Sequence, residues 1–216
     1  MYDTILFDLD GTLTDPKEGI TKSVQYALSK MGITVTDRDT LIPFIGPPLL
    51  HSFRQCYQMD DEQAAAAVRY YREYFSQTGL YENAVFAGIP SLLQRLTDQN
   101  RTLVVATSKP TVFSVTILKY FGLIGYFKEI VGSNLDGTRT EKHEVIAYAL
   151  SLLGEVNPHR TIMVGDRKHD ILGAKMNGIP CIAVAYGYGT LDELTAAAPE
   201  FLAATVEELT TRLCGE

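Results

Sequence analysis

Short apolar runs alternate along the chain with stretches that have the periodicity of amphipathic helices, and this pattern constrains the fold more than any other feature. Many of the runs are rich in β-branched residues, as is typical of strands that are buried on both faces. The alternation therefore favours an α/β fold in which helices cover both faces of a parallel sheet. The expected strands are residues 4–8, 102–107, 129–132, 161–165 and 181–185.

The long segment between Asp15 and Ile89 contains helix patterns but no convincing strand. A direct crossover between two parallel strands needs far fewer residues. We therefore predict a small helical bundle that is inserted after the first strand, with its boundaries at Asp15/Pro16 and within residues 81–87. Its expected helices lie within residues 20–31, 49–57 and 60–75.

Length and charge limit the class of protein. A chain of 216 residues that is 46% hydrophobic can bury a core of its own. Its net charge of −7 argues against contact with a nucleic acid polymer or an anionic membrane. The three cysteines lack the spacing of a zinc site or a disulfide framework, and no apolar window is long enough to span a membrane. We expect a soluble, cytoplasmic protein.

Two acids follow the first expected strand directly. Asp8 and Asp10 alternate along an extended segment, so their side chains should point to the same side, and Gly11 lets the backbone turn sharply after them. Because two nearby carboxylates repel each other, a cation is their natural partner. The alternative is an ordinary Asp-Gly turn in which Asp8 only caps the strand end.

Two further groups follow other strands or open helices. Thr107 and Ser108 come just before a helix, where a hydroxyl and free backbone N–H groups can hold an anion, although a helix N-cap is the alternative. Lys142 stands near the start of a later helix, where its charge opposes the helix dipole and favours an anionic neighbour. The alternative for Lys142 is a solvated surface position.

The last group places Asp166 and Asp170 four residues apart at a strand-to-helix turn. A helix-capping turn is again the alternative. Taken together, the four groups supply carboxylates, a hydroxyl, a lysine and backbone donors, which is what Mg²⁺ bound beside a phosphate requires. His143 and His169 lie near the expected site, where we interpret them as ordinary polar contacts.

In these motifs the chain resembles the haloacid dehalogenase superfamily of aspartyl-phosphate-forming hydrolases, in the branch of phosphoglycolate phosphatase and β-phosphoglucomutase. The matching motifs are DLDGT at residues 8–12, Thr107, Lys142 and GDRKHD at residues 165–170. The third motif departs from the family's frequent Lys-Pro, because His143 follows the lysine. The resemblance implies a Rossmann-like core made of residues 1–15 and 83–216, and a helical cap domain made of residues 16–82.

The resemblance also implies a mechanism. Asp8 would attack the phosphorus and form an aspartyl phosphate, and Asp10 would act as the general acid and base. Mg²⁺ would be held by the Asp8 carboxylate, the Asp10 backbone carbonyl and Asp166.

Further residues receive supporting roles from the same resemblance. Thr107, the Ser108 N–H and Lys142 would bind the phosphate oxygens. Asp170 would orient Lys142 or a water on the metal.

Specificity should come from the cap domain. Gly46 lies in a loop that could reach the substrate, and Arg54 could bind an anionic group of it. The alternative is that Gly46 only ends a turn and that Arg54 is a solvated helix residue. Lys109 could contact either the substrate or the cap.

The substrate that we expect is a small phosphorylated metabolite, of the phosphoglycolate or nucleoside monophosphate type. A phosphomutase and a non-catalytic protein that binds such a metabolite are the alternatives. A monomer and a homodimer are both compatible with the sequence.

Overall fold

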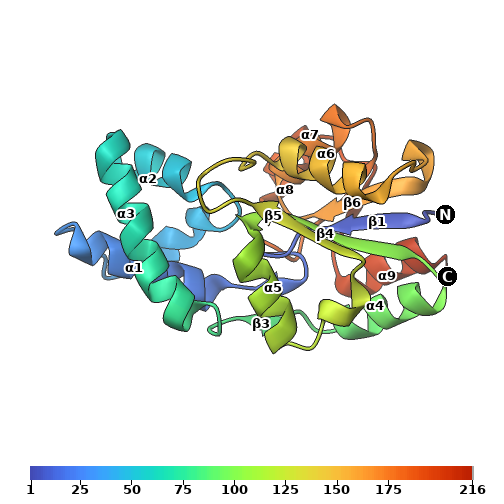
Figure 1. Cartoon of the computed structure of the whole chain (residues 1–216), viewed down its shortest axis with the longest axis horizontal. Helices are drawn as coiled ribbons and strands as arrows, with labels where there is room; N and C mark the ends of the chain where they lie inside the picture. Colours follow the sequence, from blue (N-terminus) through green and yellow to red (C-terminus); the bar gives the residue numbers. More distant parts are fainter. Residues whose placement is uncertain (216) are drawn as a thin grey trace. The chain divides into compact units, whose positions relative to one another are not determined.

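The computed structural model describes residues 1–215, and the chain divides into two compact units. The core unit consists of Met1–Asp15 and Val85–Glu216, and the inserted unit is Pro16–Ala84 (Figure 1). Our expected boundaries lay at residues 15/16 and 82/83. The catalytic and cap roles that we assigned to the two parts stay predictions.

The core unit is built on a six-stranded sheet with the order β5-β4-β1-β6-β7-β8, and every pairing in it is parallel. The expected α/β architecture is therefore confirmed. β8 is an addition to the expected strands, because its three residues, FLA, give too short a run to stand out from the sequence. The strands are β1 (Thr4–Phe7), β4 (Thr102–Pro110), β5 (Glu129–Ser133), β6 (Thr161–Gly165), β7 (Cys181–Val184) and β8 (Phe201–Ala203).

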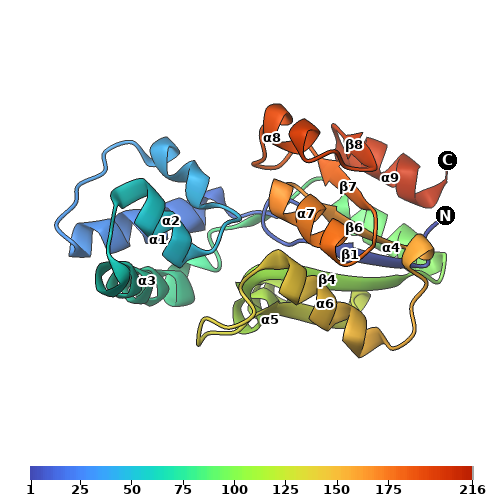
Figure 2. The same cartoon turned by 90° about the horizontal axis from the view of Figure 1, so that it is seen from above.

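Helices cover both faces of this sheet (Figures 1 and 2). One face carries α6 (Lys142–Leu153) and α7 (Lys168–Met176). The opposite face carries α4 (Ile89–Asp98), α5 (Thr111–Tyr120) and α9 (Val206–Cys214). The remaining helical segments of the core unit are the short helix α8 (Leu191–Ala196) and the 3₁₀ turns Ile124–Tyr126 and Pro158–Arg160.

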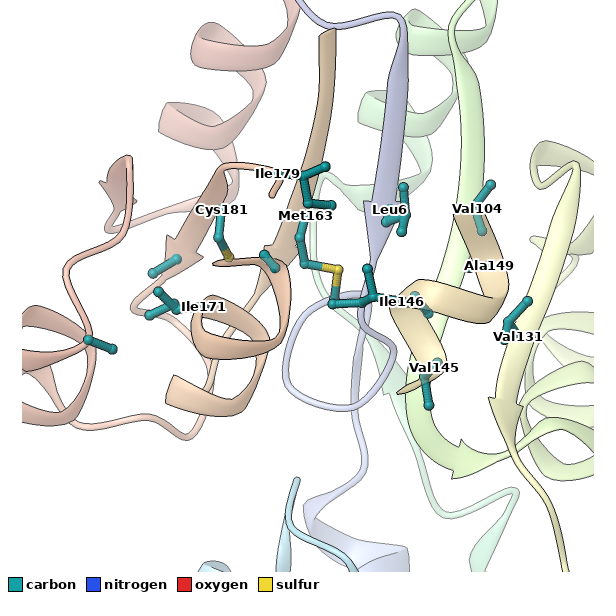
Figure 3. Packing of buried hydrophobic residues seen from close by; sticks show 14 of the residues in the cluster. Leu6, Val104, Val131, Val145, Ile146, Ala149, Met163, Ile171, Ile179 and Cys181 are labelled. Atoms are coloured by element: carbon teal, nitrogen blue, oxygen red, sulfur yellow. The ribbon is translucent and has the colours of Figure 1, made fainter. Parts of the chain in front are cut away.

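The layer between the sheet and α6 shows why the strand residues that face this side of the sheet are apolar. Leu6 of β1 pairs in register with Val104 of β4 and Met163 of β6, and all three are fully buried against Ile146 of α6 (Figure 3). Each fully buried side chain of this size contributes about 1.5–3 kcal/mol. The layer therefore fixes the register of the central strands.

β1 lies in the middle of the sheet, between β4 and β6. Phe7, its last residue, is in register with Val105 and with Val164, and the Asp8 N–H donates to the Val164 carbonyl at 2.9 Å. Because the strands are parallel, the segments that follow them emerge at the same edge of the sheet. That edge is where the candidate site residues were expected to meet.

The inserted unit is helical. Its buried apolar side chains include Leu28, Phe44, Phe53 and Phe75, which come from different helical segments and form a core of their own. Within residues 1–215, no helix combines the length and the hydropathy that crossing a membrane requires. The segments are α1 (Lys17–Lys30), a 3₁₀ helix (Arg38–Phe44), α2 (Leu49–Tyr57), α3 (Asp61–Tyr74) and a π-helical turn (Phe75–Gly79).

The inserted helices agree with the sequence periodicity. Asp60 opens α3 through a capping box with Gln63, in which each side chain bonds the other residue's backbone N–H. The 3₁₀ helix and the π turn were not expected, because such short segments carry no periodic pattern of their own. β2 (Thr14–Asp15) and β3 (Ala84–Val85), at the two boundaries of the inserted segment, form a separate two-stranded sheet.

Candidate active site

Asp8 and Lys142 form a buried ion pair at the carboxyl end of β1. The distance between Lys142 Nζ and Asp8 Oδ1 is 2.9 Å, and a second ion pair joins Lys142 Nζ to Asp170 Oδ1 at 2.8 Å. Lys142 Nζ also donates to the Ala106 carbonyl at 3.2 Å. With its side chain only 4% exposed, Lys142 is not the solvated surface residue of the alternative interpretation.

Three carboxylates converge at this point. Asp8, Asp166 and Asp170 each offer an oxygen, and these oxygens all lie within 4.8 Å of one another. Asp166 Oδ2 accepts a hydrogen bond from the Tyr188 N–H at 2.7 Å, whereas its buried Oδ1 has no hydrogen-bond partner in the described part of the chain. A buried carboxylate oxygen that lacks a donor is well suited to a hard cation.

Glycines make room for Asp166. A Cβ atom on Gly11 would overlap the Asp166 carboxylate, and Gly11 also has a φ of +83°, which favours glycine. A Cβ atom on Gly187 would overlap the same side chain from the loop after β7. Two backbone segments thus approach Asp166 more closely than any side chain would allow.

A second buried ion pair holds the other acid of the first motif. Lys109 Nζ lies 2.7 Å from Asp10 Oδ2, and the two side chains are 6% and 10% exposed. Lys109 comes from the end of β4, the strand that also provides Thr107.

Thr107 and Ser108 lie at an irregular end of β4. The register between β4 and β5 shifts between Ala106 and Pro110, so the backbone leaves the regular ladder there. Thr107 is 2% exposed, and its Oγ1 accepts a hydrogen bond from the Lys109 N–H at 3.3 Å. α5 begins directly after this segment, at Thr111, and the anion-binding role of Thr107 and Ser108 stays a prediction.

Burial and mutual repulsion raise the pKa values of these acids. Burial raises the pKa of Asp166 well above its usual range, and the charges of Asp170 and Asp8 raise it further. Burial, offset in part by Lys142, brings the pKa of Asp170 to about 6. Burial alone would lower the pKa of Lys142, but the charges of Asp170 and Asp8 raise it above its usual value.

When all its carboxyl groups are ionised, the site carries more negative than positive charge. Its carboxylates outnumber its lysines by two, which is the charge of one divalent cation. The surplus, the oxygen-only ligand set and the donor-free Asp166 oxygen all fit Mg²⁺. The residues concerned are Asp8, Asp10, Asp166, Asp170, Lys109 and Lys142.

Comparison with known proteins identifies the family. A family profile described as haloacid dehalogenase-like hydrolase matches residues 5–184. The chain belongs to this family.

Close relatives of the chain include a 5′-nucleotidase of Pseudomonas aeruginosa, 53% identical over 208 residues that cover 96% of this chain and 94% of that protein. A solved structure of a predicted phosphatase from Clostridium acetobutylicum is 48% identical, covers 100% of both chains and has a TM-score of 0.96. Tyrosine-protein kinase PtkA of Mycobacterium tuberculosis is 39% identical over 95% of this chain and 70% of its own length. The predicted family and the predicted class of enzyme, a phosphatase of this hydrolase family, are confirmed.

The structure brings together the core residues that the family motifs indicated. Asp8, Asp166, Asp170 and Lys142 share one buried cluster, and Asp10 lies beside it, since the Asp8 charge contributes to raising its pKa. The turn interpretation of the first motif also holds, because the Thr12 N–H donates to the Leu9 carbonyl at 3.3 Å and closes a turn around Asp10 and Gly11. The roles of these residues stay predictions.

The inserted-unit residues are less informative. Arg54 is 41% exposed and forms an ion pair with Asp61 at 2.5 Å. Such pairs are common between ordinary surface residues, so this one does not indicate a substrate contact. Gly46 has a φ of +104°, which a turn requires of it whether or not it serves a substrate.

Two site features were not expected from the sequence. One is the ion pair of Lys109 with Asp10, for which the sequence left only substrate or cap contacts open. The other is the loop after β7, where Tyr188 binds Asp166 and the Tyr186 hydroxyl donates to the Thr12 carbonyl at 3.0 Å. Glycine-rich residues 186–189, YGYG, follow a predicted strand and were a usable signal.

Proposed function

We propose that this chain is an Mg²⁺-dependent phosphatase that hydrolyses a small phosphomonoester through an aspartyl phosphate, with a nucleoside 5′-monophosphate as the first candidate substrate and phosphoglycolate as the second. The observation that carries the proposal is the buried cluster of Asp8, Asp166 and Asp170 around Lys142. The relative named 5′-nucleotidase gives nucleotides their priority.

Mg²⁺ would be held by the carboxylates of Asp8 and Asp166 and by the backbone carbonyl of Asp10. When bound, the ion would neutralise charge on the oxygens of the phosphoryl group. Asp170 contributes by holding Lys142, to which it is paired at 2.8 Å.

The nucleophile is Asp8. Its Oδ1 is already engaged by Lys142 and by the Leu9 N–H, at 2.9 and 2.8 Å, which leaves Oδ2 as the attacking oxygen. A bond forms between Oδ2 and phosphorus while the bond between phosphorus and the ester oxygen breaks. Thr107 and the Ser108 N–H bind the phosphoryl oxygens during this step.

Asp10 moves the proton. Burial raises its pKa even though the Lys109 charge opposes the shift, so Asp10 can carry a proton nearer to neutral pH than an ordinary aspartate. In the first step it protonates the departing alcohol oxygen. In the second step it takes a proton from the water that attacks the aspartyl phosphate, which releases inorganic phosphate and regenerates Asp8.

The inserted unit is proposed as the cap that selects the substrate, with Gly46 and Arg54 as its candidate contacts. The protein is further proposed to work in the cytoplasm, where its cysteines, Cys56, Cys181 and Cys214, stay as the free thiols that the structure shows.

A second candidate function is phosphoryl transfer to an acceptor other than water. This candidate is supported by the relative named tyrosine-protein kinase, which aligns with 95% of this chain, and by the resemblance to phosphomutases. Transfer would yield a phosphorylated acceptor or an isomerised sugar phosphate in place of inorganic phosphate.

The experiment is a screen of phosphomonoesters with the purified protein, in which released phosphate is measured in chelator and after addition of Mg²⁺. Turnover of at least one nucleoside 5′-monophosphate is expected, with loss of activity in chelator and recovery with Mg²⁺. Full activity without any divalent ion would contradict the metal assignment. Phosphorylated acceptor without phosphate release would favour the second candidate function.

A further inference from the structure

Lys109 and Asp10 form a buried pair that the mechanism above does not use. Lys109 Nζ contacts Asp10 Oδ2 at 2.7 Å, and neither side chain is more than 10% exposed. A buried pair of this kind gains little stability over apolar residues, because both charges lose their hydration. A functional role is therefore worth seeking for it.

The backbone around Lys109 is fixed by its neighbours. The Lys109 N–H donates to Thr107 Oγ1 at 3.3 Å, and the Ser133 hydroxyl donates to the Ser108 carbonyl at 2.8 Å. A Cβ atom on Gly132 would overlap the Lys109 carbonyl, so β5 packs directly against this segment. The irregular end of β4 thus holds Lys109 in one place.

The two oxygens of Asp10 differ in their surroundings. Oδ2 is engaged by Lys109, whereas Oδ1 is buried and has no hydrogen-bond partner among residues 1–215. Lys142 likewise forms its ion pair with one oxygen of Asp8, which is Oδ1. Each acid of the first motif is therefore held through one oxygen by its own buried lysine.

We propose that Lys109 is a positioning residue: it fixes the Asp10 carboxyl group through Oδ2 and so leaves Oδ1 as the oxygen that gives and takes the proton. The inference rests on the proposed function, in which Asp10 is the general acid and base. The Oδ1–H bond breaks as the departing ester oxygen gains the proton. Oδ1 later regains a proton from the attacking water.

The test compares two leaving groups in the first chemical step. The single-turnover rate of phosphorylation and the steady-state kcat and KM are measured at saturating Mg²⁺, with the best alkyl phosphomonoester of the screen and with p-nitrophenyl phosphate. An alkoxide needs a proton as it departs, whereas p-nitrophenolate leaves without one. The variants are Lys109→Met, Lys109→Arg and Lys128→Met, the last being an exposed lysine of the core unit that serves as the matched control.

Lys109→Met is expected to slow the alkyl reaction at least about 30-fold, as part of the 10²–10⁴-fold that general acid catalysis supplies. Its effect on p-nitrophenyl phosphate is expected to be at least about tenfold smaller, with KM changed about twofold at most. Lys109→Arg should recover most of the alkyl rate, because it keeps the charge and a donor. Lys128→Met should match the wild type.

Three results would overturn the positioning role. Equal slowing with both leaving groups would mean that Lys109 only supports the local structure. A raised KM with kcat unchanged would make it a substrate contact, and unchanged kinetics would give it no part in the reaction. Retained turnover in Asp8→Asn would instead overturn the proposed function and this inference together.

Discussion

Gly11 lies against the carboxylate of Asp166 so closely that any side chain at Gly11 would overlap it. The two residues follow neighbouring strands, β1 and β6, which pair in register. The contact brings the backbone of the first motif directly to the acid of the last one. A change at Gly11 therefore tests whether the space around Asp166 matters for function.

Gly11→Ala is expected to reduce kcat at least about 100-fold, because the added methyl group displaces Asp166 from the proposed metal site. It should also cost about 1–3 kcal/mol of stability, since alanine is strained at a φ of +83°. Phosphate release and urea unfolding would check the two effects. Gly32→Ala is the matched control, because Gly32 has a φ of +78° but open space around it. Equal losses of activity in both variants would contradict the interpretation.

Lys142→Met is expected to destabilise the protein by about 3–5 kcal/mol, because Asp8 and Asp170 would stay buried without their shared cation. Activity should be lost as well. The double variant Lys142→Met/Asp170→Asn removes one of the two buried carboxylates that lack a cation. It should therefore regain part of the stability but none of the activity. Urea unfolding in chelator measures the stability of both variants. If Lys142→Met were as stable as the wild type, the buried carboxylates would not need the lysine, and the prediction would be wrong.

The metal-free protein is expected to lose stability as the pH rises through the titration of Asp170. Its pKa is about 6 in the fold and about 3.9 in an unfolded chain, so the folded state holds more protons between these values. A group of this kind lowers the free energy of unfolding as the pH increases across that window. Asp170→Asn should therefore gain stability relative to the wild type between pH 4 and pH 7, in thermal unfolding with chelator. A constant difference between the two proteins over this range would contradict the prediction.

Asp8→Asn is expected to abolish turnover while the fold is kept, because an amide oxygen cannot attack phosphorus effectively. We expect a loss of about 10⁴-fold or more in kcat, as for other nucleophiles of covalent catalysis. Circular dichroism would verify the fold, and Asp192→Asn, which changes an exposed acid in the first turn of α8, is the matched control. Phosphate release that is unchanged in Asp8→Asn would remove Asp8 as the nucleophile.

The sheet could be predicted from the sequence because its central strands are buried on both faces. Residues such as Leu6 and Met163 belong to continuous apolar runs, and the helices between the runs show their own period. β8 carries only three residues, Phe201–Ala203, and the π turn Phe75–Gly79 continues α3 without a change of pattern. Such segments are defined by what they pack against, which the sequence alone does not disclose.

Within the site, the acids at strand ends could be predicted, whereas their partners could not. Asp8 and Asp166 stand directly after apolar runs, so the parallel sheet itself implies that they meet. The pairing of Lys109 with Asp10 depends on the shifted register at the end of β4, and the bond from Tyr188 to Asp166 depends on the course of a loop. Neither geometry follows from residue spacing.

The central place of β1 has a consequence for how the protein matures. Asp8 is synthesised before both strands that flank β1, because these strands begin at Thr102 and Thr161. Pairings between strands that are distant in sequence form slowly. A nascent chain that ends before β6 lacks one of the two strands that flank β1 and hold Asp8 in place. Catalytic competence should therefore arise only after β6 (Thr161–Gly165) has been synthesised.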